Sequence, residues 1–413
     1  MNTLRQALRY PRPFWTLLAG YFINRASAAL VWPFLTLIMR ERLDAPLTTI
    51  TALISVQALA GALSTSIIGA VMDRYGRKRA MIAGLVLSSG VLFMMSRADA
   101  LWQWSLLAAL HGAFNPVFYV GASAMVADLV PPEERTNAYA LMRMVANLGI
   151  AVGPALGGFL LVTSQSLPFI VTGTVNLVLA GFTIVYVGET LVRRRAAAVN
   201  EAPARGYKVM LADQRYLRFW SAFTLLEVAA SLIFVLLPVY SKENFGLLES
   251  QFGWLLTINA LMVVTMQMAL TRWSSLFQPL LVIGIGALFY MAGMIGIALS
   301  TQFVGFALSM VVITIGELLV APTATAMVAN LAPPDMRARY MGIFSLTYTV
   351  GSGFGPVMGG FLNDNLAPVA IWYGGALCAT ISAGWFIWMW RHHKSWTRIE
   401  VEPIAAEPLP QEV

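Results

Sequence analysis

The chain has 413 residues, of which 58% are hydrophobic and only 11% are charged, and its mean hydropathy is +0.70. Because a soluble domain carries about a quarter charged residues, this composition excludes an ordinary soluble protein and points to lipid as the solvent. The formal net charge of +7 does not indicate nucleic-acid binding, because the cations gather in segments that flank apolar runs.

Apolar segments about 20 residues long recur along the chain, and a helix of that length crosses the hydrocarbon core. They are continuous, whereas a β-barrel would show short alternating segments. The first segment lacks a small-residue cleavage site, so we interpret it as a retained span and not as a signal peptide. We predict an all-α membrane protein with twelve spans, at residues 14–38, 46–71, 79–96, 102–129, 139–161, 167–188, 219–240, 252–271, 279–299, 303–329, 340–362 and 369–390.

Lys and Arg fall mainly on one side of this arrangement, which by the positive-inside rule places both termini in the cytoplasm of a multi-pass protein of the cell (inner) membrane. One long polar connection interrupts the pattern between spans six and seven. We therefore divide the chain into a six-helix half (1–188), a cytoplasmic linker (189–217), a second six-helix half (218–398) and a cytoplasmic tail (399–413). The lone Cys378 excludes an intramolecular disulfide.

The two halves repeat each other. Residues 124–160 align without gaps with residues 326–362, and the prolines, the arginine and the glycines of the first segment recur in the second. Six spans per half with the same orientation predict parallel repeats, related by an axis along the membrane normal. Such repeats suit a transporter whose halves rock about a central site.

The loop between spans two and three reads "GAVMDRYGRKR" (69–79). It resembles the signature loop of the major facilitator superfamily, and the twelve-span repeat extends that resemblance over essentially the whole chain. The resemblance implies the major facilitator fold and a loop that latches the two halves in the outward-open state, with Asp73 facing the start of span eleven. Topology alone would also explain the cations. Asp128, at the inner end of span four, could support the latch or cap a helix. The latch candidates are Gly69, Asp73, Arg74, Gly76, Arg77, Lys78 and Asp128.

Span five contains "GIAVGPALGG" (149–158), which resembles the motif of drug:proton antiporters in this superfamily. Small residues allow close helix approach, and a proline can bend a membrane helix. Span eleven carries nearly the same pattern, so ordinary helix packing in both halves remains an alternative. The helix-bend candidates are Gly149, Gly153, Pro154, Gly157 and Gly158.

Four ionisable residues lie well inside the predicted spans: Arg25, Arg143, Glu227 and Glu317. Such groups are costly in hydrocarbon and usually face a cavity, a partner or a transport path. Span ten, "GELLVAP", resembles the corresponding stretch of bacterial multidrug:proton antiporters of the drug-efflux branch. That resemblance implies that Glu317, and by span and depth Glu227, carry protons or engage a cationic substrate. Arg25 is the expected switching partner of the two acids, and Arg143 is expected to make a structural or inter-half contact. The alternative is a static salt bridge.

Span four departs from the family pattern, because it reads "AALHGAFNPVFYV" (108–120) without the usual arginine. This departure makes the two acids more important to proton coupling. Gln57 is one of few amides in the predicted cavity spans, which argues against a sugar substrate. Trp32 is an aromatic candidate for the cavity wall. The other candidate substrate contacts are Tyr21, Asn24, His111, Asn115, Tyr119, Phe223, Asn259 and Tyr348.

Taken together, the sequence predicts a proton-coupled secondary transporter that exports lipophilic or cationic drugs by proton antiport with alternating access. The alternative is a proton-coupled transporter of one metabolite, such as a sugar, an amino acid or a lipid-like compound. Because no nucleophile turn, zinc motif or nucleotide loop is present, we expect no enzymatic activity, no metal and no cofactor beyond the proton gradient. The expected partners are a small-molecule substrate, protons and the bilayer, with no nucleic acid, and we expect a monomer.

Overall fold

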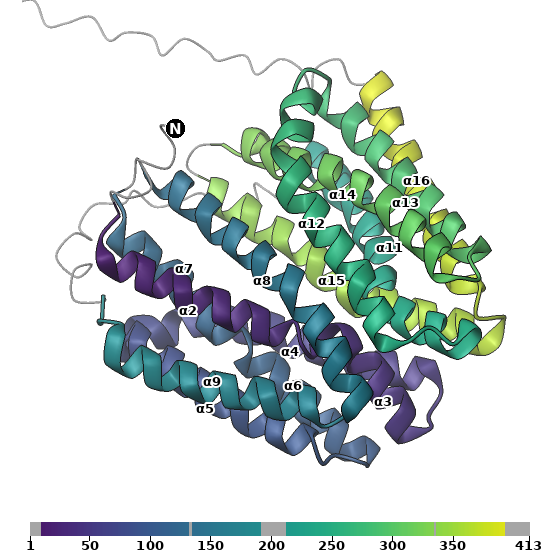
Figure 1. Ribbon diagram of the computed structural model, residues 1–413. Coiled ribbons are helices and arrows are strands. Elements are labelled where there is room, and N and C mark those ends of the chain that lie inside the picture. Colours follow the sequence, from purple (N-terminus) through teal and green to yellow (C-terminus); the bar gives the residue numbers. More distant parts are fainter. Residues whose placement is uncertain (1–9, 132–133, 191–211, 334–335, 393–413) are drawn as a thin grey trace, which may run out of the picture.

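The computed structural model describes residues 10–131, 134–190, 212–333 and 336–392. The described residues form helices and no strand. The first half, in purple to teal in Figure 1, contains α2 (Arg12–Ala28), the short helix η1 (Trp32–Phe34), α3 (Leu35–Leu43), α4 (Leu47–Tyr75), α5 (Arg77–Met95), α6 (Leu101–Phe114), α7 (Pro116–Leu129), α8 (Arg135–Thr163) and α9 (Leu167–Tyr186).

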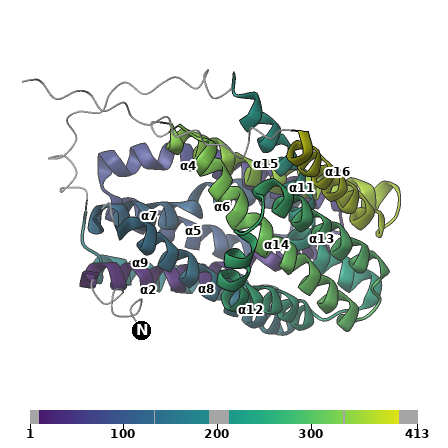
Figure 2. The same ribbon diagram turned by 90° about the horizontal axis from the view of Figure 1, so that it is seen from above.

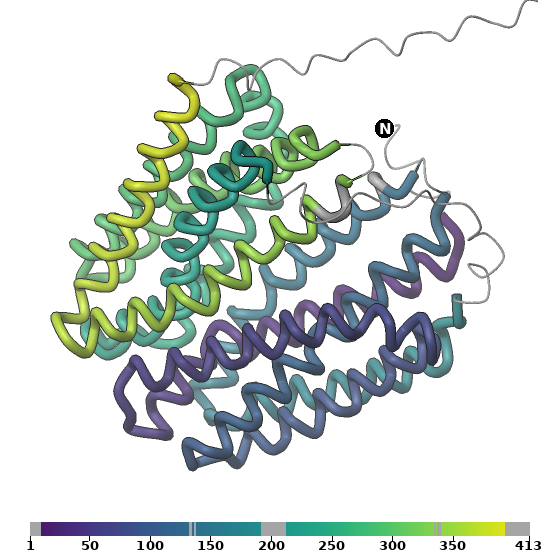
Figure 3. The backbone as a smooth tube through the Cα atoms, turned by 180° about the vertical axis from the view of Figure 1, so that it is seen from behind, coloured from purple at the N-terminus to yellow at the C-terminus, as the bar shows by residue number. Residues whose placement is uncertain are grey.

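The second half, in green to yellow, packs as a separate group of helices beside the first, as the views from above and behind also show (Figures 2 and 3). It contains α11 (Gln214–Phe245), α12 (Glu249–Ser274), α13 (Pro279–Leu299), α14 (Phe303–Leu331), α15 (Arg337–Asn365) and α16 (Ala370–His392). The predicted all-α fold is confirmed. Ten helices of the described chain are long and apolar enough to cross a membrane, so the chain is a multi-pass membrane protein.

Two predicted spans are interrupted, which corrects our expectation of continuous helices there. The first span breaks between Ala28 and Leu35 into α2, η1 and α3, and the fourth breaks at Asn115 into α6 and α7. A proline lies at each break. Pro33 and Pro116 lack the backbone N–H that a continuous helix would need, and proline is well suited to the first turn of a new helix.

We call the end of the molecule where α2 begins, α9 ends and α11 begins the linker face, and the other end the opposite face. The halves meet mainly through two helix pairs, α4 with α15 and α8 with α12, and α3 and η1 of the first half also contact α11 of the second. One hydrophobic core cluster contains residues of both halves, including Phe34 and Phe252, whose ring centroids are 5.7 Å apart. A second cluster belongs to the first half alone.

Glycines at corresponding positions of the two repeats allow close contacts between the helices. In α8, a Cβ on Gly157 would lie 2.5 Å from the carbonyl oxygen of Leu30, which follows α2, and one on Gly158 would lie 2.6 Å from that of Glu249 in α12. In α15 the equivalent Gly359 faces Leu236 of α11, and Gly360 faces Leu47 of α4. Each helix therefore packs one glycine face within its own half and uses a neighbouring glycine to touch the other half. Pro154 lies inside α8, which continues to Thr163.

Bonds between polar side chains join the halves at the opposite face. The Asp364 carboxylate at the end of α15 accepts hydrogen bonds from Leu47 N (3.2 Å) and from Thr48 N and Oγ1 (2.7 Å each), so it caps the start of α4. Arg40 pairs with Glu243 at 2.9 Å. Lys242 pairs with Glu41 of the first half and with Glu249 of its own half. This face of the molecule is closed.

Candidate functional site

A cavity of about 540 Å³ lies between the halves. It brings together six residues that the sequence placed in the cavity: Glu227 of α11, Glu317 of α14, Tyr348 of α15, Asn115 between α6 and α7, Trp32 of η1 and Gln57 of α4. The second half also contributes Tyr290 of α13. The acids and tyrosines thus come from one half, whereas the amides come from the other.

Glu317 is held by hydrogen bonding. Asn259 Nδ2 on α12 donates to Glu317 Oε2 at 2.8 Å and to Thr314 Oγ1 at 3.0 Å, and Thr314 Oγ1 donates to Met310 O at 2.7 Å. The cation that interacts electrostatically with Glu317 is Arg143 of α8, in the other half. A desolvated carboxylate of this kind is stabilised by such a donor and cation and can exchange a proton when either moves.

Glu227 lies in different surroundings. The backbone of α15 passes close to it, because a Cβ on Gly351 would lie 2.7 Å from Glu227 Cβ. Its electrostatic neighbours are Glu317, Tyr290 and Tyr348. The two carboxylates therefore share one cavity and influence each other, but Arg143 interacts with Glu317.

Arg25 lies in the first half, against aromatic rings. Its Nε and Nη2 both donate hydrogen bonds to Tyr21 Oη, at 3.3 Å each. Its guanidinium carbon lies 4.9 Å from the centre of the Tyr119 ring. These three residues thus form one group, which the sequence did not predict. None of them lines the cavity. A switching contact between Arg25 and either acid stays a prediction.

The other predicted substrate contacts also lie outside the cavity lining. Asn24 is buried in α2, and its carbonyl accepts a hydrogen bond from Ser27. His111 is buried at the end of α6, and its Nδ1 has no hydrogen-bond partner among the described residues. Phe223 is buried against Phe344, with ring centroids 4.8 Å apart. Their roles as substrate contacts stay predictions.

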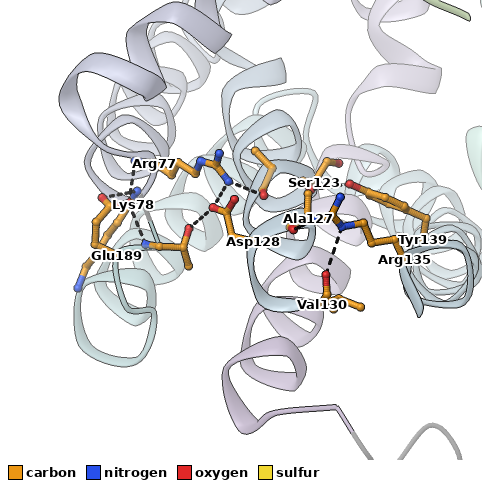
Figure 4. A network of polar contacts seen from close by, with 11 residues as sticks. Arg77, Lys78, Ser123, Ala127, Asp128, Val130, Arg135, Tyr139 and Glu189 are labelled. Atoms are coloured by element: carbon orange, nitrogen blue, oxygen red, sulfur yellow. Dashed lines mark hydrogen bonds and ion pairs between the residues drawn. The ribbon is translucent and has the colours of Figure 1, made fainter. Parts of the chain in front are cut away.

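The signature loop lies at the linker face, away from the cavity, and Figure 4 shows its polar contacts. Arg77 forms a buried ion pair with Asp128 of α7, and Thr190 Oγ1 donates to the same carboxylate at 2.7 Å. Glu189 accepts hydrogen bonds from the backbone N–H groups of Arg77 and Lys78, at 3.1 Å each. The loop is therefore held by Asp128 of the first half and by the first two residues of the predicted linker.

Gly76 makes the turn of this loop possible. Its φ is +100°, a backbone conformation that favours glycine, and a Cβ there would lie 2.5 Å from Glu189 Oε2, so a larger residue would also displace that carboxylate. Asp73 and Arg74 are exposed near the end of α4, and Gly69 has open space around it. The predicted contact of Asp73 with the start of span eleven stays a prediction.

A second set of bonds joins α7 to α8 beside this loop (Figure 4). Arg135 donates to Ala127 O at 2.7 Å and to Val130 O at 3.2 Å, and Tyr139 Oη donates to Ser123 O at 3.0 Å. Among the residues placed by the structure, no group of three or more acids, histidines or cysteines could hold a metal ion.

Our sequence reasoning missed Tyr290 as a site residue, and it gave no role to Glu189 and Thr190. The signal for Tyr290 was present, because it lies in the middle of a predicted span that contains no ionisable Asp, Glu, Lys or Arg. Glu189 and Thr190 were placed in the linker, where a polar sequence gave no indication that they bind the signature loop.

The fold, with a cavity between two halves of membrane-spanning helices, is that of a membrane transporter. The family model described as Major Facilitator Superfamily matches residues 17–248 and 219–405, and the chain belongs to this family. One similar curated protein is the "Na(+), Li(+), K(+)/H(+) antiporter" of Planococcus maritimus, which is 25% identical over 91% of this chain and 95% of its own length. Another is the "Multidrug resistance protein MdtH" of Yersinia pestis (strain Pestoides F), 27% identical over 72% of this chain and 73% of its own.

Solved structures show the same fold. A peptide transporter POT in complex with sulfate matches 94% of this chain and 96% of its own with a TM-score of 0.79 and 15% identity. A point mutant of the nucleoside transporter NupG matches 92% of this chain and 100% of its own with a TM-score of 0.77 and 13% identity.

Proposed function

We propose that this protein is a proton-coupled secondary transporter that exports lipophilic or cationic drugs in exchange for protons. The observation that carries the proposal is the pair Glu227 and Glu317 in one cavity between the halves, with Glu317 bound to Asn259. Ionisable groups are retained inside a membrane protein where they bind ions, protons or substrate. The name of the MdtH relative supports drug export as the transport activity.

Alternating access supplies the transport cycle. The bonds at the opposite face close one entrance, and with the linker face in the cytoplasm this conformation is open inward. Drug binding from the cytoplasm releases a proton from the acids, and protons from outside reload them after the halves rock. Glu317 is the proposed proton carrier, and Arg25 and the signature loop act in the conformation that opens outward.

A second candidate is antiport of small monovalent cations for protons. The Planococcus maritimus relative bears that name and matches nearly the full chain. Oxygen atoms of Glu317 and Thr314 lie around the Asn259 amide, and oxygen ligands suit hard cations. A single metabolite is the third class of substrate that the sequence leaves open.

The test is transport by the full chain in proteoliposomes under an imposed pH gradient. A lipophilic cationic dye, radioactive sodium or rubidium, and a metabolite panel are compared, and proton movement is followed with a pH-sensitive probe. We expect dye movement that follows the gradient and is lost in Glu317→Gln. Asp99→Asn, an acid in an exposed turn, serves as the matched control and should retain transport.

Dye efflux that is independent of the gradient, or full activity of Glu317→Gln, contradicts proton coupling through this residue. Gradient-driven movement of the alkali cations without the dye supports the second candidate instead. Movement of one metabolite alone supports the third.

A further inference from the structure

The cavity has acids but no cation in its lining. Among the described lining residues, Glu227 and Glu317 are acidic and no lysine, arginine or histidine is present. Arg143 interacts with Glu317 from outside the lining, and Arg25 is bound to Tyr21 and Tyr119 in the first half. Once ionised, Glu227 is therefore the carboxylate that needs a cation from elsewhere, because a buried charge is costly without a partner.

The wall contributed by the first half contains an acceptor without a donor. Gln57 of α4 lines the cavity, yet its Oε1 is buried and has no hydrogen-bond partner among the described residues. An unpaired buried carbonyl is destabilising. Rotation of the side chain would bring this oxygen to the cavity, where the N–H group of a ligand would pair with it, whereas a ligand without a donor would leave it unpaired.

Gln57 is positioned by backbone packing. A Cβ on Gly112 of α6 would overlap the backbone oxygen of Gln57, so the two helices are in contact at this point. Its cavity neighbours are apolar: Ile54 and Ala58 on the same helix, and Trp32, whose ring centroid is 6.1 Å from that of Phe234. The backbone at Gln57 is thus fixed, and its amide is a polar group beside apolar residues that suit an apolar ligand body.

We propose that Gln57 selects cations that carry N–H groups, namely protonated amines and guanidinium compounds, over quaternary ammonium compounds of the same size. The inference rests on the proposed function and names its substrate class. The positive charge is bound by Glu227, and one N–H donates to Gln57 Oε1. A primary ammonium has three donors and can serve both acceptors at once. A quaternary ammonium satisfies the carboxylate electrostatically but leaves the amide unpaired.

The test compares two probes of matched body, phenylbutylammonium and phenylbutyltrimethylammonium, by calorimetric binding to the purified full chain and by transport in proteoliposomes. The wild type should bind the primary ammonium about tenfold more tightly, the effect of one hydrogen bond to a charged donor. Gln57→Met, which keeps the length of the side chain and removes the amide, should reduce this ratio to about one. Gln278→Met, at an exposed position outside the cavity, should leave it unchanged.

Glu227→Gln separates the charge contact from the hydrogen bond to Gln57, because it should weaken the binding of both probes by the same factor. Gln57→Leu is the second variant if Gln57→Met does not fold, as judged by its unfolding temperature. Equal affinity of the wild type for the two probes, or a ratio that survives both Gln57 variants, overturns the inference while leaving drug export intact. Failure of the wild type to bind or move either probe while it moves another class of solute overturns the proposed function, and the inference with it.

Discussion

Glu317 and Glu227 illustrate how two similar side chains in one cavity acquire different surroundings. Glu317 accepts a hydrogen bond from Asn259 and interacts with Arg143, whereas Glu227 is adjacent to the glycine backbone of α15. The identity of the residue does not determine this difference. It arises from what the neighbouring helices place beside each carboxylate.

At the same scale, Asn259 should matter to transport through Glu317. Asn259→Leu keeps a side chain of similar volume but removes the donor, which leaves the carboxylate oxygen without that bond. We expect about a tenfold loss in the initial rate of gradient-driven dye efflux, because a hydrogen bond to a charged group contributes about 1.5–3 kcal/mol.

The matched control is Asn244→Leu, which removes an exposed amide that bonds within its own helix. It should retain the wild-type rate. An Asn259→Leu protein that is folded and transports normally would show that this hydrogen bond is not needed for proton movement.

At the scale of the helices, α15 packs closely against α4 of the first half because Gly360 has no side chain. Gly360→Ala would place a methyl group 2.6 Å from Thr51 Oγ1 and 2.9 Å from the Leu47 backbone, so α4 and α15 must separate at the opposite face. We expect a population shift toward the conformation that opens there, seen as a longer distance between spin labels on the two helices.

Gly353→Ala on the same helix is the control, because a Cβ there meets nothing within 4 Å. It adds the same methyl group and should leave the label distance unchanged. Equal distances in both variants would mean that the glycine contact does not hold this face closed.

The capping of α4 by Asp364 gives this contact a pH dependence. Burial alone would raise the pKa of Asp364, but the hydrogen bonds from Thr48, Asn363 and Leu47 outweigh it and lower the pKa below its usual value. A lowered pKa means that the folded protein favours the carboxylate. Its contribution is therefore fully present above about pH 4, the usual Asp value, and is lost as the pH falls through the lowered pKa.

Asp364→Asn should accordingly destabilise the protein by about 1 kcal/mol at neutral pH, as expected for a helix cap. The difference in unfolding temperature between wild type and variant should stay constant from pH 8 to about pH 5 and shrink below about pH 4. If the difference in unfolding temperature instead grows on acidification, the pKa of Asp364 is not lowered in the folded protein.

At the scale of the whole molecule, transport requires the halves to separate at the opposite face. Because Cys378 is the only cysteine, Cys378→Ala provides a background for placing pairs of thiols. Glu41→Cys with Lys242→Cys puts one thiol on each half where the native side chains form an ion pair. A short, cleavable cross-linker there should stop transport, and reduction should restore it.

The control pair, Ser96→Cys with Ser166→Cys, lies within the first half, where the Ser166 hydroxyl donates to Ser96 O at 2.8 Å. Cross-linking this pair should leave transport intact. Continued transport by the cross-linked inter-half pair would contradict rocking of the halves as rigid units.

Much of the fold could be predicted from the sequence, because span length and a gap-free repeat both reflect constraints along the chain. The site could be predicted less well. Arg25 was expected beside the acids, yet the side chain bonds to Tyr21, a neighbour one helical turn away. Which residue faces a cavity depends on the rotation of each helix, and the weak amphipathic pattern of a buried membrane helix does not determine it. The same limitation hid Tyr290, and it gave no indication that Phe223 packs against Phe344.

The division of the cavity between the halves has an evolutionary consequence. The titratable residues lie on α11, α13, α14 and α15, while Gln57 and its apolar neighbours lie on α4. Substitutions on α4 can alter which compounds fit without changing a titratable group. We expect selection under a new toxic compound to collect mutations on this helix first, so that the range of exported compounds diversifies while the energy source is retained.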